Sequence, residues 1–132
     1  MRGTKLVTVL FLAAAAYDGI LGAAFLVAPG LPFRAFDVTP PNHSGYVQFP
    51  ALLLLIFSWM FLRVAMDPVA NRSLIPYGMA LKVSYCGVVF GYWFTTGIPG
   101  MWKPFALADL LFLLCFGWAW VRLGAPAERS AL

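Results

Sequence analysis

Charged side chains are scarce in this sequence of 132 residues, since only 11% are Asp, Glu, Lys or Arg. Soluble globular domains carry roughly 25% charged residues. The shortage excludes an ordinary soluble domain, and the 62% share of hydrophobic residues places the chain in the membrane class. The net charge of +4 is spread over single residues between apolar runs, whereas a nucleic-acid-binding protein concentrates it on one face, so we expect no nucleic-acid partner.

Metal-ligating and redox-active residues are also few. His43 is the single histidine, and Cys86 and Cys115 lie apart within apolar runs. No spacing typical of a zinc or haem site is present, and free buried cysteines usually act as small hydrophobic residues. We therefore expect no metal and no cofactor.

Four apolar runs dominate the sequence, at about 6–28, 49–66, 74–96 and 104–123. Each approaches the roughly 20 residues that a helix needs to cross a bilayer. In lipid, backbone groups must bond within their own segment, which favours helices. The sequence predicts an all-α membrane protein, in which residues 1–132 form a single bundle of four transmembrane helices.

Prolines and glycines support these boundaries. Pro29 and Pro32 end the first run, and Pro50, Pro76 and Pro104 stand near the starts of the other three. Proline is tolerated in a first helical turn because the amides there have no intrahelical partner. Between the first two runs, the stretch LPFRAF at 31–36 predicts a short interfacial helix.

The distribution of basic residues predicts the orientation in the membrane. With a cytoplasmic N-terminus, the inner side carries Arg2, Lys5, Arg63, Arg72, Arg122 and Arg129, and the outer side carries Arg34 and Lys103. The excess of positive charge inside favours cytoplasmic N- and C-termini and location in the cell (inner) membrane.

The first run also has features of a secretory signal peptide. Arg2 and Lys5 precede an apolar stretch that ends in the small residues 14–16. The apolar character resumes after Asp18 and continues to Ala28, which is long for a signal peptide. We therefore interpret this run as the first membrane span.

Three ionisable residues lie well inside the runs: Asp18, Lys82 and Asp109. Each costs about 2.5–3.5 kcal/mol at mid-membrane on insertion scales, so such residues usually face the bundle interior and find partners. At a rise of about 1.5 Å per residue, the membrane depth of Lys82 is closer to that of Asp18 than to that of Asp109. We expect Lys82 to pair with Asp18, and we expect water or a ligand to bridge the gap to Asp109.

Aromatic residues share helical faces with these charges. Tyr85 and Tyr92 follow Lys82 at helical spacing, and Phe105 and Phe112 flank Asp109. The candidate site is therefore an aromatic-lined cavity that contains two carboxylates and one ammonium group. If all three ionise, the net charge is −1, which predicts either a protonated aspartate or a bound cation.

Two alternatives for the charged cluster stay open. Lys82 and an aspartate can form a structural ion pair that fixes helix register, or the cluster can anchor a ligand or relay protons. Separately, small residues at Ala15, Gly19 and Ala23 form a face that allows close helix packing, within the chain or in a homodimer.

The stretches YDGILGAAFLVAP and YVQFPALLLLIFSWMFLRVAMDPVANRSLIPYGMALK resemble small bacterial four-helix membrane proteins, some of them called DoxX-like. The segment MDPVANR is the most specific part. The resemblance implies a four-helix membrane bundle; DoxX itself is linked to thiosulfate:quinone oxidoreduction. The segment MWKPFALADLLF is similar to a helix of the sterol-binding EXPERA proteins, which bury an acid after an aromatic run, although here the segment falls in the last span.

Three functions compete. The first is a multi-pass membrane protein that binds or carries a small lipophilic or amphipathic ligand in a pocket within the bundle, with Lys82 anchoring an acidic group of the ligand. The second is a structural or accessory subunit of a larger membrane complex. An enzyme acting on a lipid or quinone ranks last, because the sequence has no Ser-His-Asp constellation and no redox CxxC pair. Expected partners are membrane lipids, a lipophilic small molecule, and a second copy or a larger complex.

Overall fold

The computed structural model describes the backbone of residues 2–131 and the side chains of residues 4–124; the side chains of Arg2 and Arg129, used above for orientation, lie outside the described residues. Within these limits every regular element is a helix: α1 (Arg2–Val27), α2 (Leu31–Ala35), α3 (Gly45–Met66), η1 (Arg72–Leu74), α4 (Ile75–Trp93), η2 (Gly100–Trp102) and α5 (Lys103–Ala131). Four stretches are long and apolar enough to cross a membrane: Thr4–Val27, Gly45–Met66, Arg72–Trp93 and Gly100–Gly124. The prediction of an all-α, multi-pass membrane protein is confirmed.

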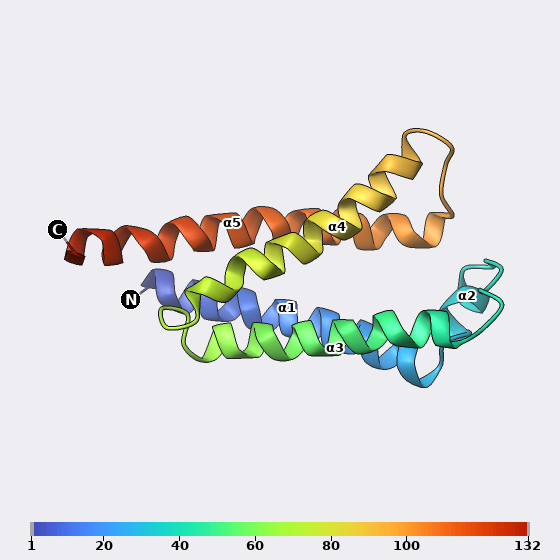
Figure 1. Ribbon diagram of the computed structural model, residues 1–132, viewed down its shortest axis with the longest axis horizontal. Coiled ribbons are helices and arrows are strands. Elements are labelled where there is room, and N and C mark those ends of the chain that lie inside the picture. Colours follow the sequence, from blue (N-terminus) through green and yellow to red (C-terminus); the bar gives the residue numbers. More distant parts are fainter. Residues whose placement is uncertain (1, 132) are drawn as a thin grey trace.

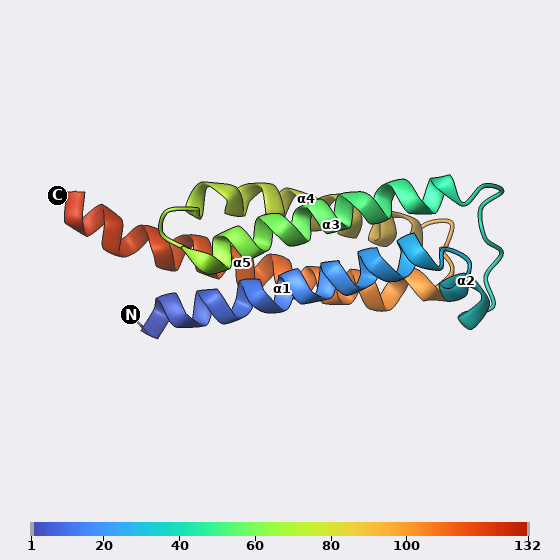
Figure 2. The same ribbon diagram turned by 90° about the horizontal axis from the view of Figure 1, so that it is seen from below.

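The four long helices form two pairs. Helix α1 packs along α3, and α4 packs along α5; we call these the α1–α3 pair and the α4–α5 pair. Figure 1 shows α4 running obliquely and moving away from α3 toward the end that carries α2. Both ends of the described chain lie at the opposite end of the bundle (Figures 1 and 2).

Several helix ends differ from the predicted spans: α1 begins before its apolar run, α5 continues beyond its run to Ala131, and α4 and α3 differ as follows. Helix α4 ends at Trp93 although the apolar run continues to 96, because Gly97 adopts φ +92° and donates its N–H to the Tyr92 carbonyl, which closes the helix. Helix α3 begins at Gly45, before the apolar run, so Pro50 lies inside it. Hydrophobicity marks the lipid-facing part of a helix, and the helix itself can extend beyond that part.

Small residues allow α1 and α3 to approach closely. The Ser58 hydroxyl donates a hydrogen bond of 2.6 Å to the Ala15 carbonyl across the two helices. At Gly22, a Cβ atom would lie only 2.8 Å from the Ala51 carbonyl oxygen, so this position requires glycine. The predicted small-residue face is therefore used within the chain, although its last member, Ala23, is exposed.

Arg72 joins the start of the α4–α5 pair. Its guanidinium group donates two hydrogen bonds, of 3.0 and 2.8 Å, to the Trp120 carbonyl and lies 3.6 Å from the centre of the Trp120 ring. Five donors on a planar group allow arginine to bind a carbonyl and stack on an aromatic ring together. Arg72 thus fixes the beginning of the third span against α5.

The buried side chains form two apolar clusters with the charged residues between them. The first cluster, near the chain ends, centres on Phe11, Phe61 and Phe116. The second, near α2, contains Phe25, Phe33, Ala51 and Met101. Asp18 and Asp109 fall between these clusters along α1 and α5, so the apolar clusters enclose the polar centre from both ends.

The outer surface of the bundle is apolar. Large hydrophobic side chains are exposed on every long helix, among them Ile20, Ile56, Trp59, Leu111, Leu114 and Val121. A soluble monomer rarely exposes so much contiguous apolar surface, whereas lipid covers such a surface in a membrane. The predicted short helix at 31–36 is present as α2, with Leu31 and Phe36 exposed and Phe33 buried against the second cluster.

Candidate functional site

Lys82 lies at the centre of the bundle and joins three helices. Its Nζ atom is 3.0 Å from Oδ1 and 3.3 Å from Oδ2 of Asp18 on α1, and 2.9 Å from Oδ1 of Asp109 on α5. These three carboxylate oxygens match the three N–H donors of an ammonium group. The structure therefore brings all three predicted charges into one cluster.

Direct contact between Lys82 and Asp109 corrects the sequence-based expectation. The depth estimate separated these residues and predicted a bridging water or ligand, which is wrong, since the ion pair measures 2.9 Å. The estimate treated every helix as straight and perpendicular to the membrane. Helix α4 instead runs obliquely to α5 (Figure 1), so counting residues along it does not give membrane depth directly.

The cluster is almost completely shielded. Lys82 and Asp18 are each 1% exposed and Asp109 is 7% exposed. Aromatic rings surround the ammonium group, with the centres of Tyr17 and Phe112 at 5.4 and 5.3 Å from Nζ and that of Phe61 at 5.8 Å. Burying a charge is costly unless it is paired, so the two carboxylates and the surrounding rings are what allow a lysine at this position.

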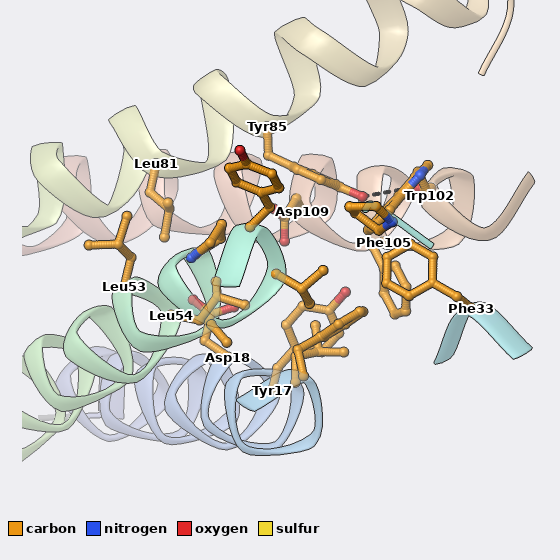
Figure 3. A pocket seen from close by; sticks show the side chains of 17 residues that line it. Tyr17, Asp18, Phe33, Leu53, Leu54, Leu81, Tyr85, Trp102, Phe105 and Asp109 are labelled. Carbon is orange, nitrogen blue, oxygen red and sulfur yellow. Dashed lines mark hydrogen bonds between the residues drawn. The ribbon is translucent and has the colours of Figure 1, made fainter. Parts of the chain in front are cut away.

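A cavity of about 400 Å³ adjoins the cluster and reaches Asp18 and Asp109. Figure 3 shows Tyr17 and Asp18 extending into it from α1, with Asp109 and Phe105 approaching from α5. Most of its wall is apolar, and every long helix contributes. The apolar wall includes Leu21, Phe25, Phe33, Leu54, Trp102 and Phe105.

Polar groups on the cavity wall are few and have different roles. The Tyr85 hydroxyl donates a hydrogen bond of 3.0 Å to the Trp102 carbonyl, which ties α4 to the start of the last span (Figure 3). The Tyr17 hydroxyl is buried, and no described residue provides it with a hydrogen-bond partner. Buried hydroxyl groups are normally satisfied, so Tyr17 marks the cavity as a place where a partner is missing.

The predicted aromatic residues fall into three groups: two line the cavity, one packs against the charged cluster, and one lies outside the site. Tyr85 and Phe105 line the cavity together with Asp18 and Asp109. Phe112 lies outside the cavity wall and packs against Tyr17 and the Lys82 ammonium group. Tyr92 is 54% exposed and takes no part in the site, because α4 moves away from the other helices before reaching it.

Several lining residues escaped the sequence analysis. Tyr17 lines the cavity, and Phe33 of α2 turns inward against Trp102, although neither Tyr17 nor Phe33 was among the predicted site residues. Helix α3 contributes Ala51 and Leu54, which carry no polar signal. The adjacency of Tyr17 to Asp18 was a usable clue, whereas apolar lining residues cannot be distinguished from core residues without the fold.

The described residues offer no metal centre. No group of three or more His, Cys, Asp or Glu side chains within residues 4–124 converges to hold a metal ion. Cys86 is buried and directs its thiol toward the Ala106 carbonyl at 3.5 Å, and Cys115 is a second free cysteine, half-buried. The polar groups at the site are two carboxylates, one ammonium group and the hydroxyl groups of Tyr17 and Tyr85.

Comparison with protein-family models, with characterised proteins and with solved structures finds no match to this chain. The resemblance to DoxX-like and EXPERA proteins stays a prediction, and the functional proposal rests on the geometry of the site.

Proposed function

We propose that this protein binds or carries a small lipophilic or amphipathic ligand in the cavity between its two helix pairs. The observation that supports the proposal is the cavity of about 400 Å³ that ends at Asp18 and Asp109. Ligand sites are typically clefts of about 300–1,000 Å³ with mostly apolar walls and a few convergent polar groups. The cavity has this size and composition.

The rim of the cavity supports access from the bilayer. Among the lining residues, Tyr46 and Leu53 are 68% and 39% exposed, and both belong to α3. Apolar, exposed side chains at the rim favour a ligand that is already dissolved in lipid. A lipid-soluble molecule then reaches the buried charges without crossing a hydrated vestibule.

Photoaffinity labelling tests the proposal. The purified chain in lipid nanodiscs is exposed to photoactivatable forms of dodecanol, dodecylamine and dodecanoic acid, and labelled residues are mapped by mass spectrometry. We expect at least one probe to label cavity residues of α1 and α3, and an excess of the unmodified compound to suppress that label. Labelling confined to outward-facing residues, for all three probes, contradicts the proposal.

A matched pair of variants sharpens this test. Leu21 lines the cavity, whereas its neighbour Ile20 is 70% exposed on the outer face. Leu21→Trp fills part of the cavity and is expected to reduce cavity labelling at least about fivefold, by analogy with the costs of overpacking. Ile20→Trp adds the same side chain to the lipid-facing surface and is expected to leave cavity labelling unchanged.

We further propose that both termini lie in the cytoplasm and that the protein resides in the inner membrane. The bundle end that holds the described chain ends also carries Arg63 and Arg72, which supports this orientation under the positive-inside rule. In a variant without native cysteines, Asp37→Cys is expected to react with a membrane-impermeant maleimide on intact cells. Val69→Cys is expected to react only after permeabilisation, and the reverse pattern contradicts the orientation.

A structural or accessory role is the second candidate, and one observation favours it. Lys82 contacts both aspartates directly, so folding alone accounts for the burial of the three charges. Purification from the native membrane in mild detergent separates the candidates. A stable assembly with other polypeptides favours the accessory role, and a lone monomer or homodimer opposes it.

A further inference from the structure

The cavity meets the anionic side of the charged cluster. Asp18 and Asp109 belong to the cavity wall, whereas Lys82 lies behind them and does not. The three N–H donors of Lys82 already face three carboxylate oxygens. An acidic ligand group would therefore approach two carboxylates and find no free ammonium donor, which argues against the sequence-based idea that Lys82 anchors an acid.

Asp109 is the carboxylate that a ligand can reach. Its side chain is 11% exposed, compared with 1% for Asp18 and Lys82. Only its Oδ1 atom lies within hydrogen-bonding distance of Nζ, and no described residue donates to Oδ2. Asp18 uses both of its oxygens on Lys82. The cavity thus ends at an available carboxylate oxygen.

Tyr17 places a second polar group near this part of the cavity, and a rotation of its side chain would bring the buried hydroxyl into contact with a ligand. The hydroxyl is buried on the cavity wall with no partner among the described residues. The Tyr17 ring also lies close to the cluster, with its centre 5.4 Å from the Lys82 ammonium nitrogen. The Tyr17 hydroxyl oxygen can accept a hydrogen bond, and the ionised Asp109 carboxylate accepts hydrogen bonds but cannot donate them. Together they suit a ligand group that donates several hydrogen bonds.

Charge balance points to the same ligand chemistry. Two ionised carboxylates and one ammonium sum to −1, and an unbalanced charge is costly in a low-dielectric interior. A ligand ammonium group brings the sum to zero. Building on the proposed function, we infer that the ligand is a protonated lipophilic amine. Its ammonium group binds Asp109 Oδ2 and the Tyr17 hydroxyl, and its hydrocarbon portion lies against Phe25, Phe33 and Trp102.

The three probes named above test this inference when their half-saturating concentrations for cavity labelling are compared in nanodiscs of zwitterionic lipid. Dodecylamine alone among the three probes offsets the negative charge of the cluster, and its ammonium group donates up to three hydrogen bonds where a hydroxyl donates one. It is therefore expected to saturate at a concentration at least about tenfold lower than dodecanol. Dodecanoic acid is expected to bind most weakly, because its carboxylate faces two like charges.

Asp109→Asn is the decisive variant. It keeps an oxygen for Lys82 and leaves Lys82 balanced by Asp18, and it removes the charge that attracts the amine. We expect the preference for dodecylamine over dodecanol to fall to about twofold or less. Asp37→Asn makes the same chemical change at an exposed residue whose φ of +55° suits asparagine, and it is expected to retain the full preference.

Tyr17→Phe provides a readout that does not depend on the stability of Asp109→Asn. Its hydroxyl has no partner among the described residues, so the fold does not rely on it. We expect about a threefold or greater loss of dodecylamine affinity, as for a lost hydrogen bond. Cavity labelling that favours dodecanol or dodecanoic acid, or amine affinity unchanged in both Asp109→Asn and Tyr17→Phe, overturns the inference while the proposed function stands. Absence of cavity labelling by all three probes overturns both.

Discussion

Lys82 is the residue on which three of the four long helices converge. Its contacts with Asp18 and Asp109 are all buried, so each charge depends on the others for compensation. Removing one member of a buried ion pair usually costs about 3–5 kcal/mol, because an uncompensated charge stays behind. The cluster thus holds α1, α4 and α5 in register at the depth where the cavity reaches Asp18 and Asp109.

Lys82→Met is expected to lower the free energy of unfolding by about 3–5 kcal/mol, since it leaves two carboxylates buried without a counter-ion. Chemical denaturation in mixed micelles measures the change. Lys103→Met is the matched control: Lys103 lies 4.7 Å from the centre of the Trp93 ring at the end of the bundle, an interaction of about 0.5–1 kcal/mol. Equal stability of the two variants would show that the cluster does not hold the bundle together.

At the scale of elements, the α1–α3 pair is the more closely packed unit. Gly22 permits backbone contact with Ala51, and Ser58 bonds to Ala15 across the same interface. This contact determines which face of α1 is directed toward the other helix pair, and Asp18 lies on that face. Small residues at the α1–α3 interface therefore help to position Asp18, although they are not part of the charged cluster.

Gly22→Ala is expected to destabilise the protein by about 1–3 kcal/mol, because the new methyl group would lie 2.8 Å from the Ala51 carbonyl oxygen and force α1 and α3 apart. Gly87→Ala is the control, since a Cβ atom there meets nothing within 4 Å. We expect it to be neutral, or stabilising by up to about 1 kcal/mol through helix propensity. Thermal unfolding followed by circular dichroism distinguishes the two; similar behaviour would contradict close packing at Gly22.

Contacts between Arg72 and Trp120 stabilise the α4–α5 pair. Arg72→Gln removes both hydrogen bonds to the Trp120 carbonyl and the stacking on its ring, for an expected loss of about 1–3 kcal/mol. Arg63→Gln, an exposed position at the same end of the bundle, makes the same change and is expected to stay within about 0.5 kcal/mol of the parent protein. Loss of stability in Arg63→Gln but not in Arg72→Gln would refute this role of Arg72 in the α4–α5 pair.

Across the whole molecule, the sequence predicts the four spans and the convergence of the buried charges far better than it predicts the cavity. Asp18, Lys82 and Asp109 are conspicuous because lipid penalises each of them, and that penalty forces them together. The direct bond to Asp109 depends on the oblique path of α4, which no local pattern encodes. Most of the cavity wall consists of apolar side chains, which carry the same signal whether they face a core, a cavity or lipid.

Native mass spectrometry of the protein, extracted from its own membrane in mild detergent, tests the central claim most directly. We predict that the wild-type chain retains a small lipophilic molecule, and that Ile20→Trp retains it as well. Leu21→Trp, which fills the cavity, is predicted to lose it. A wild-type chain that carries no bound molecule, or one whose bound molecule persists equally in Leu21→Trp, would contradict the account.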